Sequence, residues 1–221
     1  FTFGTGVAST VGSGLVDLNK IDQLTFLAAL VGAIVWDLIT WYYGLPSSSS
    51  HALIGGLAGA AIAKAGFAAI LWGQKWLMTL LFILLAPLMG LALAWLLMII
   101  IYWLFRKSSP VRMDKWYRWL QLFSSGNFSY SHGTNDAQKT MGIITGAMYT
   151  AGWLKSFEVP VWVVLSAHAA IALGTMSGGW RIIHTMGGRL TRLKPRSGFC
   201  AETAAAISIL FSTELKMPVS T

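Results

Sequence analysis

The chain has 221 residues, of which 55% are hydrophobic and 11% are charged, and its mean hydropathy is +0.63. An ordinary soluble domain is about 25% charged, so this composition excludes a typical soluble protein and predicts an all-α, polytopic membrane protein. The formal net charge of +8 does not indicate nucleic-acid binding, because the basic residues are concentrated in two short segments between apolar runs. Such segments orient a chain in the bilayer and lie on its cytoplasmic side.

The first predicted element is a hairpin over residues 24–63, which contains the sequence WDLITWYYGLPSSSSHALIG. Gly44 and Pro46 predict its turn, and the turn carries no charge. We therefore expect a re-entrant hairpin whose tip lies within the membrane, although two full spans would give the same topology. Serine is a favoured N-cap residue and proline suits the first turn of a helix, so the returning helix is expected over Ser47 to Ala63.

The serines at the start of this helix predict an anion site. The first N–H groups of a helix have no intrahelical partner, and the helix dipole leaves about half a positive charge at this end. Anions bind there readily, and the hydroxyls of residues 47–50 add donors that suit a tetrahedral oxyanion. The alternative is that these serines only cap the helix, while Gly55, Gly56 and Gly59 allow close helix packing.

A membrane span is predicted next, over residues 76–105, which contain no charged side chain. This run exceeds the roughly 20 residues that cross a bilayer. Residues 106–118 follow as a basic loop, which the positive-inside rule places in the cytoplasm. We expect a short helix over 116–128 and then a further span over 133–153.

A polar stretch, SYSHGTNDAQK, lies at the start of that further span. Ionisable groups at membrane depth are costly and usually line a pathway or pair with each other. Asp136 could ligate a sodium ion or carry a proton, Asn135 could offer a carbonyl oxygen, and Lys139 could pair with Asp136 or face an anion. The alternative is a capped helix start at the membrane interface, with Lys139 extending its ammonium to water.

The last elements repeat the pattern of the first half. A span over 161–180 leads into a second basic loop, residues 181–196, and residues 197–221 end in LKMPVST, which repeats the order of apolar residue, proline and hydroxyl residues. The two hairpins are entered from opposite sides, so we expect inverted repeats over residues 1–118 and 119–221. Secondary transporters with such repeats bind substrate between broken helices near the membrane midplane.

Three motifs resemble those of one family. SHGTNDAQK, residues 131–139, is similar to the second-half signature Gly-x-Asn-Asp-x-x-Lys of the inorganic phosphate transporter (PiT or Pho4) family, and WDLITWYYGLPSSSSHALIG and MPVST resemble its two hairpin motifs. The resemblance implies an integral, multi-pass protein of the cell membrane that transports inorganic phosphate. It implies sodium or protons as the coupling ion and, in some bacterial members, a metal–phosphate complex as the substrate.

By position, the resemblance also implies the site residues. The phosphate contacts would be Ser48, Ser49, Ser50, Ser220 and Thr221. The cation site would hold Asn135 and Asp136, which would be the metal ligands if the ion is sodium. The secondary candidates are Ser47, His51, Thr134, Lys139 and Glu202. Glu202 resembles an acidic residue on the entry arm of the second hairpin, and its alternative role is to pair with an arginine between Arg189 and Arg196.

The chain also departs from the family pattern. No first-half counterpart of the Asn-Asp motif is found in residues 1–23, the chain does not begin with methionine, and it stops at Thr221, where the family continues. We therefore expect a fragment that lacks the N-terminal motif and the C-terminal end. Such a fragment would lack part of the cation site and half of the second hairpin.

The expected function is secondary transport of phosphate with a coupling cation and no further cofactor. Arsenate, which has the same shape and charge, should also fit, and small-residue helix faces would allow a homo-oligomer. A passive anion channel is one alternative. A membrane hydrolase using Ser50 and His51 is another, but adjacent positions on a helix point about 100° apart, so they form a poor nucleophile and base pair. We therefore do not expect an enzyme.

Overall fold

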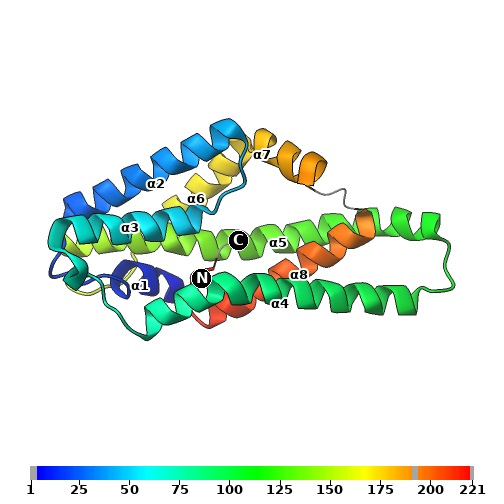
Figure 1. Ribbon diagram of the computed structural model, residues 1–221, viewed down its shortest axis with the longest axis horizontal. Helices are drawn as coiled ribbons and strands as arrows, with labels where there is room; N and C mark the ends of the chain where they lie inside the picture. Colours follow the sequence, from blue (N-terminus) through cyan, green and yellow to red (C-terminus); the bar gives the residue numbers. More distant parts are fainter. Residues whose placement is uncertain (1–3, 191–193, 220–221) are drawn as a thin grey trace.

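The computed structural model describes residues 4–190 and 194–219, and this part of the chain is almost entirely helical, with no strand (Figure 1). The prediction of an all-α fold is thereby confirmed. The helical segments are, in chain order, α1 (Gly6–Ser13), α2 (Gln23–Tyr43), α3 (Ser49–Ala65), η1 (Phe67–Ala69), α4 (Gln74–Leu104), α5 (Pro110–Thr150), α6 (Val161–Ser177), α7 (Trp180–His184), the π-helical η2 (Thr185–Leu190) and α8 (Pro195–Glu214).

Helices α2 and α3 form a hairpin where the sequence predicts one. Asp22 caps α2 by accepting a hydrogen bond from Thr25 N at 3.0 Å, and its other carboxylate oxygen lies 2.7 Å from Lys64 Nζ near the end of α3. This ion pair joins the open ends of the two helices. Of the three glycines expected to allow close packing, only Gly56 does so, because a Cβ there would lie 2.7 Å from the Ala29 carbonyl oxygen, whereas nothing lies within 4 Å of the corresponding position at Gly55 or Gly59.

Two helices of the described residues, α2 and α4, are long and apolar enough to cross a membrane, and a third span is formed if α6 and the segment from Trp180 to Gly188, bent by 59°, are counted together. Helix α4 has 31 residues with no buried position in its most apolar window. At 1.5 Å per residue it is about 46 Å long, which exceeds the roughly 30 Å hydrocarbon core. Most of its large apolar side chains are exposed, as those of lipid-facing residues are.

Helix α5 corrects the prediction for the middle of the chain. The expected short helix over 116–128 and the expected span over 133–153 are one continuous helix of 41 residues. The predicted basic loop 106–118 is correspondingly short, since its residues from Pro110 onward belong to α5. The polar stretch does not interrupt the helix because its side chains find tertiary partners or bond to carbonyls one turn back, as Ser131 does to Asn127 O at 2.8 Å. No loop therefore lies between residues 118 and 119, the predicted repeat boundary.

The second predicted basic loop, 181–196, is also largely helical. Helix α7 and the π-helical η2 cover residues 180–190, and α8 begins at Pro195. Proline suits the first helical position because the N–H that it lacks would have no intrahelical partner there. Arg196, near the start of α8, pairs with Asp114 of α5 at 2.8 Å and lies over the ring of Tyr102. These contacts tie the basic ends of α4, α5 and α8 together.

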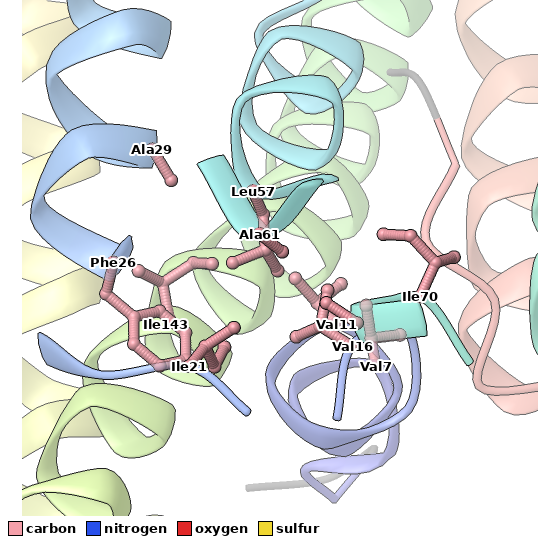
Figure 2. Close-up of a cluster of buried hydrophobic side chains, with 11 residues drawn as sticks. Val7, Val11, Val16, Ile21, Phe26, Ala29, Leu57, Ala61, Ile70 and Ile143 are labelled. Atoms are coloured by element: carbon pink, nitrogen blue, oxygen red, sulfur yellow. The ribbon is translucent and has the colours of Figure 1, made fainter. Parts of the chain in front are cut away.

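The core is built around α5, which contacts α1, α2, α6 and α8. Figure 2 shows one buried cluster to which α1, α2, α3 and α5 all contribute, with Val11 and Ile143 among its fully buried members. Helix α1 lies very close to α5, because a Cβ at Gly12 would lie 2.3 Å from Gly142 O and one at Gly142 would lie 2.4 Å from Ala8 O. Glycines thus let the two backbones touch beside the polar stretch of α5.

Candidate functional site

The tip of the first hairpin begins where α2 ends in a left-handed residue. Gly44 has φ 66°, its N–H donates to Trp41 O at 3.1 Å, and Leu45 N donates to Thr40 O at 2.8 Å. This pair of hydrogen bonds satisfies the last carbonyls of α2. Glycine suits the position because a side chain makes a left-handed conformation costly.

The tip of the second hairpin has the same geometry at the end of α8. Lys216 has φ 60°, its N–H donates to Thr213 O at 2.9 Å, and Met217 N donates to Ser212 O at 2.9 Å. The sequence separations of the two hydrogen bonds equal those at the first tip. Lysine is an unusual residue in this conformation, which costs a non-glycine residue about 1–2 kcal/mol. The two motifs that repeat in the sequence therefore also repeat in backbone conformation.

The serine run caps α3, which begins two residues later than predicted. The helix begins at Ser49, and Ser48 is its N-cap, with Oγ accepting from His51 N at 3.1 Å. Ser47 lies outside the helix and donates to Thr40 Oγ1 at 2.8 Å. Ser49 is exposed, whereas Ser50 is buried. The four hydroxyls therefore have different surroundings, and Ser50 points into the protein.

Lys139 of α5 joins the two hairpin tips. Its side chain is 2% exposed, and its ammonium donates hydrogen bonds to Asp136 Oδ1, to Ser50 Oγ and to the carbonyl oxygen of Val219. These three oxygens come from α5, from the first turn of α3 and from the segment after α8. The alternative in which Lys139 extends its ammonium to water is wrong, because the group is buried among protein oxygens.

Asp136 lies between this lysine and a histidine. Its side chain is 12% exposed, Oδ1 accepts from Lys139, and Oδ2 lies 3.5 Å from His132 Nε2. His132 in turn stacks on Phe128 one turn earlier. The carboxylate is thus held on the side of α5 that faces the hairpin tips.

Asn135 ties α5 to the second hairpin. It is fully buried, and its Nδ2 donates to Thr213 Oγ1 at 2.8 Å and to Met217 O at 3.4 Å. Its Oδ1 is also buried and has no hydrogen-bond partner within residues 4–190 and 194–219. A buried carbonyl oxygen without a partner is costly, and a cation would satisfy it. The oxygen that the sequence analysis assigns to a cation site is therefore buried and has no hydrogen-bond partner among the described residues.

The remaining predicted residues are placed less centrally. The Thr134 hydroxyl donates to Tyr130 O at 2.8 Å along its own helix, and His51 is exposed. Ser220 and Thr221 lie outside the described residues. Ser50 Oγ accepts a hydrogen bond from Lys139 and donates to Val219 O rather than to a histidine, so the geometry expected of a Ser/His hydrolase is absent at this serine.

Glu202 of α8 has partners that the sequence did not indicate. It accepts hydrogen bonds from Ser124 Oγ at 2.5 Å, from Ser125 Oγ at 2.9 Å and from Gln121 Nε2 at 3.4 Å. It forms no ion pair with any residue that the structure describes. Of the arginines in the alternative role, Arg196 pairs with Asp114 instead, whereas the side chains of Arg189 and Arg192 lie outside the described residues.

The residues of α5 around Glu202 were missed because they lie about 80 residues away from it in the sequence and only the fold brings α8 against them. Gln121, Ser124 and Ser125 share one face of a continuous helix, since side chains three and four positions apart lie on the same side. The predicted helix over 116–128 already contained this face, but nothing in the local sequence showed which part of the chain packs against it. Thr213 and the Val219 carbonyl were missed too, because only the fold brings them to α5.

A sequence model of the phosphate transporter family matches residues 1–221 of the chain. The chain belongs to the phosphate transporter family. It is 51% identical over 220 residues to a protein of Rhizobium meliloti and 43% identical over 220 residues to one of Bacillus subtilis, each named "probable low-affinity inorganic phosphate transporter". These alignments cover 99% and 98% of this chain and 66% of each relative, so the chain spans just under two thirds of their length.

A solved structure shares the fold of this family member. That structure is named "The sodium-dependent phosphate transporter", and the chain matches it with a TM-score of 0.84 at 21% identity, over 99% of this chain and 72% of the other. The relatives and the family are named for transport rather than for catalysis. The fold class predicted from the sequence, the resemblance to the family and the expectation that the chain is not an enzyme are all confirmed.

Proposed function

We propose that the full-length protein transports inorganic phosphate across the cell membrane by secondary transport coupled to a cation, either sodium or the proton. The observation that carries this proposal is the position of Lys139, whose ammonium contacts the first hairpin at Ser50 and the second at Val219. Ionisable residues in membrane-spanning helices usually mark substrate or ion pathways. Membership of the phosphate transporter family names the substrate class.

The phosphate would bind at the N-terminus of α3. Ser48, Ser49 and Ser50 start this helix, and the N–H groups of a helix's first turn are donors that bind oxyanions readily. Ser220 and Thr221 would contribute from the second hairpin. The buried ammonium of Lys139 adds a positive charge beside these donors, and arsenate would bind in the same way.

The coupling cation would bind near Asn135 and Asp136. Carboxylate and amide oxygens are ligands of hard cations, and Asn135 Oδ1 is a buried oxygen without a partner in the described chain. A cation there would offset part of the phosphate charge. The loaded carrier would then reorient more readily through the low-dielectric interior than a carrier with phosphate alone.

Reorientation would occur by movement of one repeat against the other. The predicted repeats, 1–118 and 119–221, are supported by the identical hydrogen-bond pattern at their two tips. Figure 1 shows α2 and α8 starting near opposite ends of the molecule and running in opposite directions along the view. Transporters with inverted repeats alternate access around a site at such a junction.

The test is uptake of radiolabelled phosphate into proteoliposomes that hold the full-length protein. Accumulation driven by an imposed sodium or proton gradient would support coupled transport and would name the ion. Downhill equilibration that neither gradient affects would contradict coupled transport and would favour the anion channel. Repeating the assay with and without Mg²⁺ would show whether a metal–phosphate complex is the substrate.

A further inference from the structure

The ammonium of Lys139 lies where an oxygen-coordinated cation would be expected. It is surrounded by a carboxylate oxygen of Asp136, the hydroxyl oxygen of Ser50 and the carbonyl oxygen of Val219. These oxygens come from three separate parts of the chain that meet only in the folded protein. Backbone carbonyl oxygens of broken helices coordinate sodium in secondary transporters, and carboxylate and carbonyl oxygens are ligands of hard cations in general.

All three N–H groups of the ammonium donate hydrogen bonds to these oxygens. A lysine ammonium has three N–H donors and no acceptor, and each of the three oxygens accepts one hydrogen bond. The side chain is 2% exposed, so little room remains for water at this group. A second cation at the same point would meet both steric overlap and the repulsion of a like charge at short range.

We propose that Lys139 is a tethered cation that takes the place of a free ion between Asp136 and the two hairpin tips, so that this position does not bind sodium and phosphate transport does not require it. This inference rests on the proposed function, because it names how one part of the site selects its ion. Lys139 is then a specificity-determining residue. The Asp136 carboxylate is balanced by a covalently attached charge and needs no sodium from solution, so of the two coupling ions named in the proposed function this inference selects the proton.

The substitution that tests the proposal is Lys139→Ala, because it removes the ammonium and its stem while the three oxygens remain. An oxygen-lined vacancy is then available to a small cation. Lys139→Arg is the matched control that keeps a tethered charge. Lys139→Met is a second control, because it removes the charge but leaves an apolar chain that fills the space.

The first measurement is phosphate uptake by the full-length protein in proteoliposomes, with sodium or N-methylglucamine as the external cation at one fixed pH. The wild-type protein and Lys139→Arg should show equal initial rates with the two cations. Lys139→Ala should be faster in sodium by about tenfold, which corresponds to about 1.4 kcal/mol of differential binding. Wild-type uptake that requires sodium would overturn the proposal, as would a Lys139→Ala rate that is equal in both cations.

The second measurement does not depend on transport. Thermal unfolding of the purified proteins in detergent is compared in sodium chloride and N-methylglucamine chloride without phosphate, because a ligand that binds only the folded state raises the unfolding temperature. Sodium should stabilise Lys139→Ala and should leave the wild-type protein and Lys139→Met unchanged. Stabilisation of the wild-type protein, or none of a folded Lys139→Ala, would overturn the proposal.

The two measurements separate this inference from the proposed function. If no gradient drives uptake by the wild-type protein, coupled transport fails, yet the unfolding temperatures still report whether sodium enters the vacancy. If Lys139→Ala does not fold, the wild-type protein alone decides, because sodium-dependent stabilisation or uptake contradicts a tethered cation and sodium-independent uptake supports it.

Discussion

Ser50 Oγ, in the first turn of α3, lies 3.4 Å from the carbonyl oxygen of Val219, which follows α8 and is 169 residues further along the chain. This contact joins the tips of the two hairpins directly. Lys139 contacts the same two atoms from α5. The two halves of the chain therefore meet at one small group of polar atoms, and substitutions there should affect both hairpins.

Ser50→Ala should lower stability and phosphate uptake more than Ser49→Ala. The Ser50 hydroxyl is a buried partner of Lys139, and a buried donor that loses its partner costs about 1–3 kcal/mol. Ser49 is less buried in the same helical turn, so its substitution controls for helix propensity. Thermal unfolding in detergent measures the stability difference, and equal unfolding temperatures for the two variants would contradict the placement of Ser50.

Glu202→Ala should destabilise the contact between α8 and α5. Removing the carboxylate takes the acceptor from Ser125 and leaves the buried Ser124 hydroxyl with the Gln121 carbonyl oxygen at 3.0 Å, at a cost of about 1–3 kcal/mol. Glu214→Ala is the matched control, because Glu214 is an exposed glutamate of the same helix. Limited proteolysis and thermal unfolding would reveal the difference, and a Glu202 variant as stable as the Glu214 variant would count against the cluster.

Gly142→Ala should move α1 away from α5. The added Cβ would lie 2.4 Å from the Ala8 carbonyl oxygen, which is backbone and cannot rotate aside, and overpacking of this kind costs about 1–3 kcal/mol. Gly126→Ala, in the same helix, meets nothing within 4 Å and should be neutral or slightly stabilising. Thermal unfolding of the two variants measures the difference in stability. A Gly142 variant that is no less stable than the Gly126 variant would contradict the close approach of α1 to α5.

Asp22 should give the hairpin an acid-dependent stability. The hydrogen bond from Lys64, together with those from Thr25, lowers the pKa of Asp22 from 3.8 to about 2. A carboxyl group whose pKa is lower in the folded state stabilises it above the unfolded pKa, and this contribution is lost as the pH falls through the folded pKa. The unfolding temperatures of the wild-type protein and Asp22→Asn should therefore differ above pH 3.8 and converge as the pH falls to about 2.

Both proteins are compared at constant ionic strength, because the Asp22 carboxylate is at the surface and salt screens its charge. A stability difference that does not change between neutral pH and pH 2 would show that the carboxylate charge is not what links α2 to α3. In that case the hydrogen bond to Thr25 N alone would account for the cap.

The sequence predicted the two hairpin tips well because their geometry is determined locally. Gly44 ends α2 and Ser48 caps α3, and both roles follow from the intrinsic preferences of glycine and serine. Helix α3 begins and ends two residues later than predicted. The pattern of apolar residue, proline and hydroxyl residues likewise marked a second tip, although no glycine is present at Lys216.

The course of α5 could not be predicted in the same way. Its polar stretch resembles an interruption because local hydropathy falls there, yet Asn135 and Lys139 are buried by partners 78 and 80 residues away in the sequence. Local patterns carry no information about such partners. For the same reason the sequence could not distinguish Gly56, where a Cβ would meet the Ala29 carbonyl oxygen, from Gly55 and Gly59, where a Cβ would meet nothing within 4 Å.

The central claim is that Asp136 takes part in coupling an ion to phosphate movement, and it is tested most directly with Asp136→Asn in the full-length protein. Asparagine keeps the shape but removes the charge that balances Lys139, so a stability loss of up to about 3–5 kcal/mol accompanies the change. Phosphate uptake per folded molecule, counted by size-exclusion recovery, should then lose its dependence on any imposed gradient. Gradient-driven accumulation by Asp136→Asn at the wild-type level would contradict the account.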